Sequence, residues 1–365
     1  MAYLINLLLV PIYYNILKGV RKKKAILQSN KTSNLAFIIT VCIHALLFRA
    51  LANPYNYPDG STYAEGFYYI ANMTFQEAIL SINIFTHWGT GFLLLSWISS
   101  RVVSSFEFFT IVLSILTIVP IFWFYYKTSY KILGVAMLFL IYPMMYYMGF
   151  FVLRQHLSIA FILLSLYYLE ERRKSIIFIF IAVSMHTSAI VFLPFYLWKK
   201  IDFGKAVGFK FITYSIIAFV VCRGLMSFVL SYLPKYEEIL SDGSDNNFIP
   251  AIWFTIISLC IVKSGILRCD LTIVERNILS FFLYGTFIAV FSVGLSGMGR
   301  FTICFLYILP VVLSILSFYC KDKGLKQLCW CITVLITMRQ LYYTLGTVNY
   351  DYSFLWEPST YHEIL

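Results

Sequence analysis

The chain has 365 residues, of which 60% are hydrophobic and only 12% are charged, with a net charge of +11. A soluble domain carries about 25% charged residues, so this composition excludes the usual soluble enzymes. A bilayer crossing needs about 20 mostly apolar residues, and such stretches follow one another along the chain. We therefore predict an all-α, polytopic transmembrane helical bundle of roughly 10–12 membrane segments. It should form a single integral membrane domain over residues 1–365.

The N-terminal segments predict the orientation of the chain. Residues 1–17 are apolar but lack a basic leader and a small-residue cleavage site, which favours a first span over a signal peptide. Residues 18–34 are rich in Lys and Arg and contain no acid. Because such residues mark the cytoplasmic side, we place this loop inside and do not interpret it as a nucleic-acid site. A second span, 35–51, then leads to an external loop over residues 52–86.

Later loops are assigned by the same charge rule. The acidic segment 234–248 is predicted to be a short external loop, and the tail 346–365, which has no Lys or Arg, is also predicted outside. Basic residues predict cytoplasmic loops at 171–174, 199–205, 263–276 and 321–326.

The segment between residues 86 and 198 needs at least one partial crossing. An odd number of crossings must connect the external loop to the basic cluster at Arg172. Four apolar stretches are present, at 87–103, 106–126, 132–150 and 153–169. One must be re-entrant or built of half-helices, and Pro143 makes its stretch a candidate. Residues 175–198 have basic loops at both ends, which predicts a hairpin of two short helices with His186 at its outer tip.

Several cations fall near the predicted outer face. Arg49, Arg154, His186, Arg300 and Arg339 all lie at or near the ends of predicted spans. Ionisable residues there are functional candidates, and the planar fork of Arg suits phosphate oxygens. An anionic ligand such as a lipid-linked diphosphate would explain them. The alternative is that each side chain reaches the lipid headgroups, and for Arg339 we prefer that interpretation.

Other chemistries find little support in the sequence. There is no HExxH, no DxD, no glycine-rich phosphate loop and no GxSxG, so neither a metal nor a cofactor is predicted. His156 is two residues from Arg154 and would not share its helix face, so we interpret it as structural.

Some of these residues form an ordered series of motifs. Arg49 is followed by Asp59 and Tyr63, and then by Gly91-Phe92-Leu93-Leu94. Next come Leu153-Arg154-Gln155-His156-Leu157-Ser158-Ile159-Ala160 and Ala182-Val183-Ser184-Met185-His186-Thr187-Ser188-Ala189. Arg300 and an aromatic tail at Tyr352 to Trp356 close the series. The series resembles the EpsG-type polysaccharide polymerases, relatives of the bacterial Wzy O-antigen polymerases.

Two positions depart from the pattern of that family. Met185 stands where a Phe is usual, and Gly89-Thr90 replaces a frequent Glu-Pro. No catalytic Glu is therefore expected before Gly91.

The resemblance implies a substrate and a reaction. The substrate would be a glycan repeat unit on undecaprenyl diphosphate, joined to a second lipid-linked unit at the periplasmic face of the bacterial inner membrane. We predict Arg154, His186 and Asp59 as catalytic residues, with His186 preferred over Asp59 as the general base. We predict Arg300, Arg49, Gln155 and Tyr63 as diphosphate- or sugar-binding residues. Membrane lipid and a chain-length regulator protein are the other expected partners.

Three alternatives share parts of this pattern. An O-antigen ligase or another lipid-linked glycosyltransferase would use similar chemistry, although ligases usually have a larger late external loop than 234–248. A flippase for the same lipid should show internal repeats and charges near the middle of the membrane, whereas no repeat is seen and the main charges fall near one face. A membrane acyltransferase is the third alternative, but its usual histidine motif on a helix with flanking acids is absent.

Overall fold

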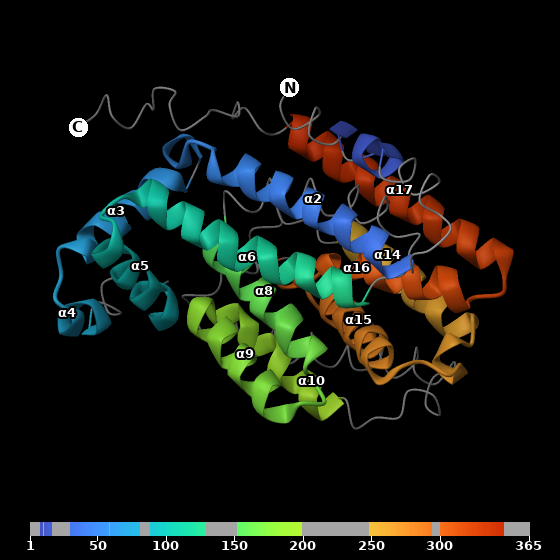
Figure 1. The fold of residues 1–365 in the computed structure, drawn as a ribbon. Coiled ribbons are helices and arrows are strands. Elements are labelled where there is room, and N and C mark those ends of the chain that lie inside the picture. Colours follow the sequence, from blue (N-terminus) through green and yellow to red (C-terminus); the bar gives the residue numbers. More distant parts are fainter. Residues whose placement is uncertain are drawn as a thin grey trace. The chain divides into compact units, whose positions relative to one another are not determined.

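The computed structural model describes residues 8–9, 11–16, 30–57, 59–80, 88–128, 152–198, 248–293 and 300–346. All regular elements in these ranges are helices, which confirms the all-α prediction. The chain forms two compact units, residues 1–190 with 336–365 and residues 191–335, which are described separately below. Figure 1 shows the helices along the chain.

Most of the predicted site residues lie in the first unit. Its described elements are α2 (Asn30–Ala50), η1 (Pro54–Asn56), α3 (Gly60–Ala71), α4 (Phe75–Leu80), α5 (Thr90–Val102), α6 (Phe106–Thr128), α8 (Leu153–Tyr167), α9 (Arg172–Met185), most of η3 (Thr187–Phe192) and the second half of α17 (Lys323–Gly346). Helix α2 packs against α6, α6 against α8, and α8 against α9. The short helices α3 and α4 pack against α5, which in turn contacts α9.

The segment predicted as an external loop is largely helical. Asn53 begins it as the cap of η1, with its Oδ1 accepting a hydrogen bond from the Tyr55 amide at 3.1 Å. In α3, the side chains of Tyr63, Phe67 and Ile70 are buried at helical spacing. This apolar face packs onto α5 and the start of α6, so the segment is a folded cap on the first unit.

The lengths of the helices indicate which segments can cross a bilayer completely. Within the described residues, helices 106–128, 273–291 and 301–319 are apolar and long enough to cross a bilayer, and 35–50, 153–167 and 249–263 are shorter apolar helices. Helix α5 has 13 residues and is about 20 Å long, against a hydrocarbon core of about 30 Å. It therefore fits a partial crossing better than a full one. The stretch 132–150, with Pro143, lies outside the described residues, and the predicted total of spans stays a prediction.

Serine contacts set the register of α8 and α9. The hydroxyls of Ser165 and Ser175 lie 3.0 Å apart, and Ser158 Oγ donates to the carbonyl of Ala182 at 2.8 Å. Ser158 and Ser165 are seven residues apart on α8, and their partners Ala182 and Ser175 are seven residues apart in the opposite direction on α9. The two helices therefore run antiparallel and keep the same register between these contacts. One further turn in the same register places Arg154 level with His186. Small polar side chains of this kind allow close helix contact within a membrane.

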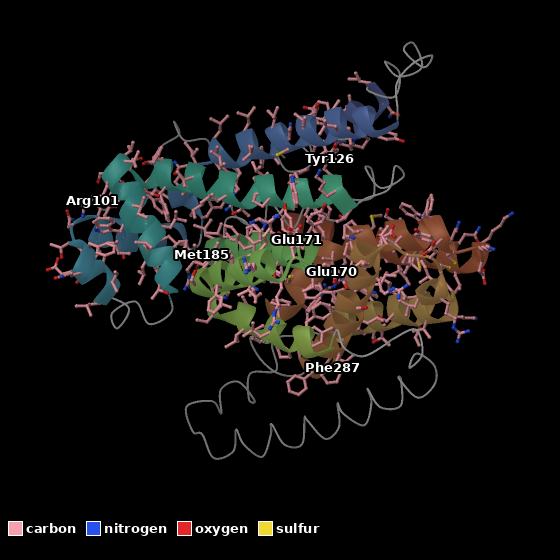
Figure 2. The ribbon with its side chains drawn as sticks, turned by 60° about the horizontal axis from the view of Figure 1, so that its bottom comes forward. Arg101, Tyr126, Glu170, Glu171, Met185 and Phe287 are labelled. Carbon is pink, nitrogen blue, oxygen red and sulfur yellow. The ribbon has the colours of Figure 1, made fainter. Side chains whose placement is uncertain are left out.

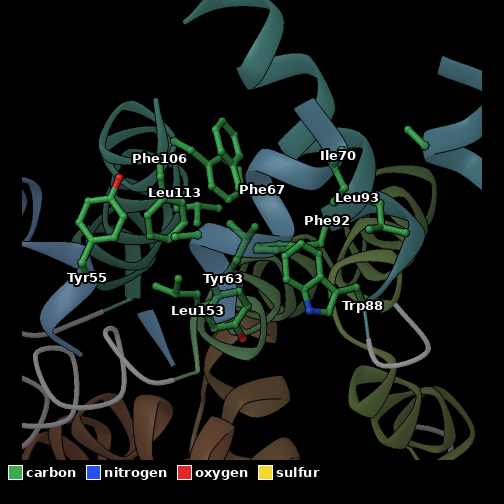
Figure 3. Close-up of a cluster of buried hydrophobic side chains, with 14 residues drawn as sticks. Tyr55, Tyr63, Phe67, Ile70, Trp88, Phe92, Leu93, Phe106, Leu113 and Leu153 are labelled. Atoms are coloured by element: carbon green, nitrogen blue, oxygen red, sulfur yellow. The ribbon is translucent and has the colours of Figure 1, made fainter. Parts of the chain in front are cut away.

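Aromatic side chains fill the core between α3, α5 and α6. Figure 3 shows this cluster, which includes Tyr63, Phe67, Trp88, Phe92 and Phe106. The rings of Phe67 and Phe109 stack at a centroid distance of 5.1 Å, and Trp88 meets Phe92 edge to face at 5.1 Å. Such pairs add to the hydrophobic gain of burial, so the cap is held firmly on the longer helices.

The described elements of the second unit are the end of η3, α10 (Leu193–Trp198), α14 (Phe248–Lys263), η5 (Ile266–Arg268), α15 (Ile273–Phe291), α16 (Arg300–Tyr319) and the first half of α17 (Lys323–Gly346). Helix α15 begins with a capping box formed by Thr272 and Glu275 and packs between α14 and α16. Apart from their end residues, the predicted external segments 234–248 and 346–365 lie outside the described residues.

Candidate functional site

Arg154 is held at the start of α8 by two aromatic residues. Its Nε donates a hydrogen bond to the hydroxyl of Tyr63 at 3.1 Å. Its guanidinium carbon lies 5.7 Å from the centroid of the Tyr63 ring and 6.0 Å from that of Trp88. The structure thus brings together Arg154 and Tyr63, which the sequence predicted as site residues. No role is predicted for Trp88 from the sequence alone, although its position just before Gly89 and Gly91 is a signal that could have indicated one.

The environment of Tyr63 keeps its phenol protonated. Burial raises the pKa of Tyr63, and the neighbouring Arg154 guanidinium opposes this shift only in part. The Tyr63 oxygen accepts the hydrogen bond from Arg154, because a guanidinium can only donate. The Tyr63 hydroxyl can therefore donate its own hydrogen to an oxygen acceptor such as a sugar or a phosphate.

His186 lies at the break predicted for residues 175–198. Helix α9 ends at Met185, and His186 has an extended backbone with φ −153° and ψ 120° before η3 begins. Its amide donates to the Ala182 carbonyl at 3.0 Å, which closes the last turn of α9. The side chain is half-buried. That the break faces outward stays a prediction.

Two glycines bring α5 against this break. A Cβ at Gly89 would overlap the Ser184 carbonyl oxygen and lie 3.0 Å from that of Met185. A Cβ at Gly91 would overlap the Ser184 hydroxyl oxygen. The Gly91-Phe92 motif therefore packs directly on the segment that carries His186. Since α8 and α9 also place Arg154 level with His186, three motifs that are separate in sequence meet at one end of the first unit.

The opposite end of α9 carries the basic cluster at Arg172. Figure 2 shows Met185 and Arg101 toward one end of these helices, and Tyr126, Glu170 and Glu171 toward the other. The candidate site and the basic loop thus lie at opposite ends of these helices, and which end faces the periplasm stays a prediction.

Arg49 and His156 form a buried pair on another face of α8. Arg49 Nη1 lies 3.0 Å from His156 Nδ1, and the two residues are only 5% and 1% exposed. Because arginine has no acceptor, Nδ1 must accept, and His156 is neutral with its hydrogen on Nε2. This contact agrees with a structural role for His156. Gln155, between His156 and Arg154 in sequence, is also buried. The substrate-binding roles of Arg49 and Gln155 remain predictions.

Substitutions of His156 should show how much its Nδ1 acceptor contributes to the stability of the folded protein. His156→Phe leaves the Arg49 guanidinium facing a hydrocarbon ring and should lower stability by on the order of 2 kcal/mol. His156→Asn keeps an oxygen acceptor close to the position of Nδ1 and should lose less. The measurement is the thermal unfolding midpoint of the detergent-solubilised protein. Equal midpoints for the two variants would contradict the assigned acceptor.

The other two predicted residues are placed less fully. Asp59 is exposed and precedes α3, where its carbonyl accepts from the Tyr63 amide at 3.0 Å but its side chain makes no cap. Arg300 begins α16 in the second unit, and its side chain lies outside the described residues. In the described part of the chain, no group of three or more His, Cys, Asp or Glu is arranged to hold a metal ion. Metal-independent chemistry stays a prediction.

Comparison with known proteins identifies the family. The model of the EpsG family matches residues 35–357, a range that includes every predicted site residue. Searches of curated proteins and of solved structures find no match. The family match covers most of the chain and confirms the resemblance that its motifs carry. This membrane protein therefore belongs to the EpsG family.

Proposed function

We propose that this protein is a polysaccharide polymerase that joins glycan repeat units carried on undecaprenyl diphosphate. Membership in the EpsG family indicates a polysaccharide polymerase. The observation that carries the proposal further is the setting of Arg154, a cation held by Tyr63 and Trp88 at the same end of the helices as His186. We place this end at the periplasmic face of a bacterial inner membrane.

The reaction forms one glycosidic bond and breaks one bond to phosphate. A hydroxyl oxygen of the acceptor sugar attacks the anomeric carbon of the donor glycan. The bond from that carbon to the diphosphate oxygen breaks, and its electron pair leaves with undecaprenyl diphosphate. The hydroxyl proton passes to a base, for which we propose His186. Negative charge grows on the departing oxygen, so a fixed guanidinium stabilises the transition state more than the ground state.

His186 is favoured over Asp59 as the base by its position. It lies level with Arg154 in the α8–α9 register, whereas the Asp59 side chain is exposed ahead of α3. We expect His186→Ala to reduce polymerisation on the order of 10²-fold and Asp59→Asn to reduce it far less. The length distribution of surface polysaccharide from complemented cells measures both. A greater loss with Asp59→Asn would reverse the assignment.

The orientation of the site can be tested by labelling. Asn72 is exposed at the end of α3, and Arg173 is exposed at the start of α9. In cells whose outer membrane is permeabilised and whose inner membrane is intact, a membrane-impermeant maleimide should label Asn72→Cys more strongly than the wild-type protein. It should label Arg173→Cys only after the inner membrane is broken. The reverse pattern would place the candidate site in the cytoplasm.

The proposed function itself is tested in a host that lacks the gene. Loss of polymerisation should leave a single repeat unit capped on its lipid, and the wild-type gene should restore the ladder. Long chains that stay on undecaprenyl diphosphate would instead indicate a ligase. Repeat units retained on the cytoplasmic face would indicate a flippase, and either result would overturn the proposal.

A further inference from the structure

The indole ring of Trp88 lies beside the Arg154 guanidinium. Only 8% of Trp88 is exposed, and its ring centroid is 5.5 Å from that of Tyr63. Figure 3 shows these two rings next to each other. Both lie within about 6 Å of the guanidinium carbon, the range in which the face of an aromatic ring attracts a cation. Two rings from different segments thus meet one cation.

Gly66 provides the space that Trp88 occupies. A Cβ at Gly66 would overlap Trp88 Cη2 and lie 2.8 Å from Cζ2 and 3.3 Å from Cζ3. These atoms all belong to the six-membered ring of the indole. Gly66 follows Tyr63 by three residues on α3, so the two share a helix face. Helix α3 therefore supplies one ring of the site and the room for the other.

We propose that Trp88 is a positioning residue for the polymerisation reaction and fixes the guanidinium plane of Arg154 for the donor diphosphate. The inference rests on the proposed function, because that function gives Arg154 its role. Arginine has a long, flexible side chain, and its Nε donates to the Tyr63 hydroxyl. The rings of Tyr63 and Trp88 add a restraint on rotation of the guanidinium plane. A hydrogen-bond donor such as this guanidinium, when already in place, does not have to reorganise as negative charge develops, and this is the source of its catalytic value.

The first test compares Trp88→Phe with Trp88→Leu. Both variants are smaller and apolar, but only phenylalanine offers a π face to the cation. Purified protein in nanodiscs would be given the host's own lipid-linked repeat unit, extracted from cells that lack the gene. Per folded molecule, we expect Trp88→Leu to lower kcat about tenfold relative to Trp88→Phe, with KM little changed. A purely structural role for Trp88 would give the two variants equal activity per folded molecule.

The second test uses the contact with Gly66. Gly66→Ala should push the indole away from Arg154 and lower kcat. Adding Trp88→Phe removes the overlapping ring atoms and should restore activity to the level of Trp88→Phe alone. Adding Trp88→Leu relieves the same overlap without restoring a π face, and this double variant should remain as slow as Trp88→Leu. Recovery with leucine equal to that with phenylalanine would overturn the inference.

The experiments separate this inference from the proposed function. If Trp88→Leu equals Trp88→Phe while Arg154→Ala is inactive, the role of Trp88 is overturned and the proposed function stands. If the wild-type protein does not lengthen the repeat unit, the proposed function is overturned, and the role of Trp88 with it.

Discussion

Arg154→Ala is expected to reduce polymerisation on the order of 10³-fold, because it removes the cation that stabilises the departing diphosphate. Arg154→Lys keeps the charge but loses the planar group and the Nε that bonds to Tyr63. We expect it to recover only a small part of the activity. The measurements are the polysaccharide ladder in complemented cells and the rate of chain lengthening by purified protein.

A matched control distinguishes this effect from a general loss of positive charge. Arg173 is exposed at the start of α9, at the other end from the candidate site. Arg173→Ala should leave the ladder unchanged at equal membrane expression. An intact ladder with Arg154→Ala would remove this residue from the mechanism.

Gly89→Ala and Gly91→Ala are expected to abolish polymerisation for the same steric reason but to differ in how they can be rescued. A Cβ at Gly91 would overlap the Ser184 hydroxyl oxygen and lie 2.9 Å from the Ser184 Cβ. Ser184→Gly removes both atoms and leaves the Ser184 carbonyl carbon at 3.1 Å, so the double variant Gly91→Ala with Ser184→Gly should recover a large part of the activity. A Cβ at Gly89 meets the Ser184 backbone carbonyl instead, and Ser184→Gly should not rescue it.

This comparison tests whether α5 must lie against the segment that carries His186. Ser184→Gly alone places a glycine near the end of α9 and should cost about 1 kcal/mol of stability with the ladder retained. Gly324→Ala is a control of the same chemistry, because its nearest neighbour is the flexible Asp322 carboxylate at 3.3 Å. Rescue of both glycine variants, or of neither, would contradict the assigned contacts.

Composition and motif order were enough to predict the class of the protein, and they singled out Arg154 and Tyr63, which the structure brings into contact. An apolar chain that must satisfy its backbone hydrogen bonds inside a bilayer can only be helical or form a closed barrel. The charge rule also predicted the break at His186, because basic loops flank residues 175–198 at both ends. The helical spacing of Tyr63, Phe67 and Ile70 could have revealed α3, which we interpreted as part of a loop.

The contacts that make the site were decided by tertiary structure. Periodicity shows which face of a helix is buried, but it does not show which other helix covers that face. Arg154 and Tyr63 are 91 residues apart, and Arg49 and His156 are 107 residues apart. The fit of Trp88 over Gly66, and of α5 against Ser184, depends on the absence of a side chain at a single point of contact. Such close packing is a property of two surfaces together, so neither segment predicts it alone.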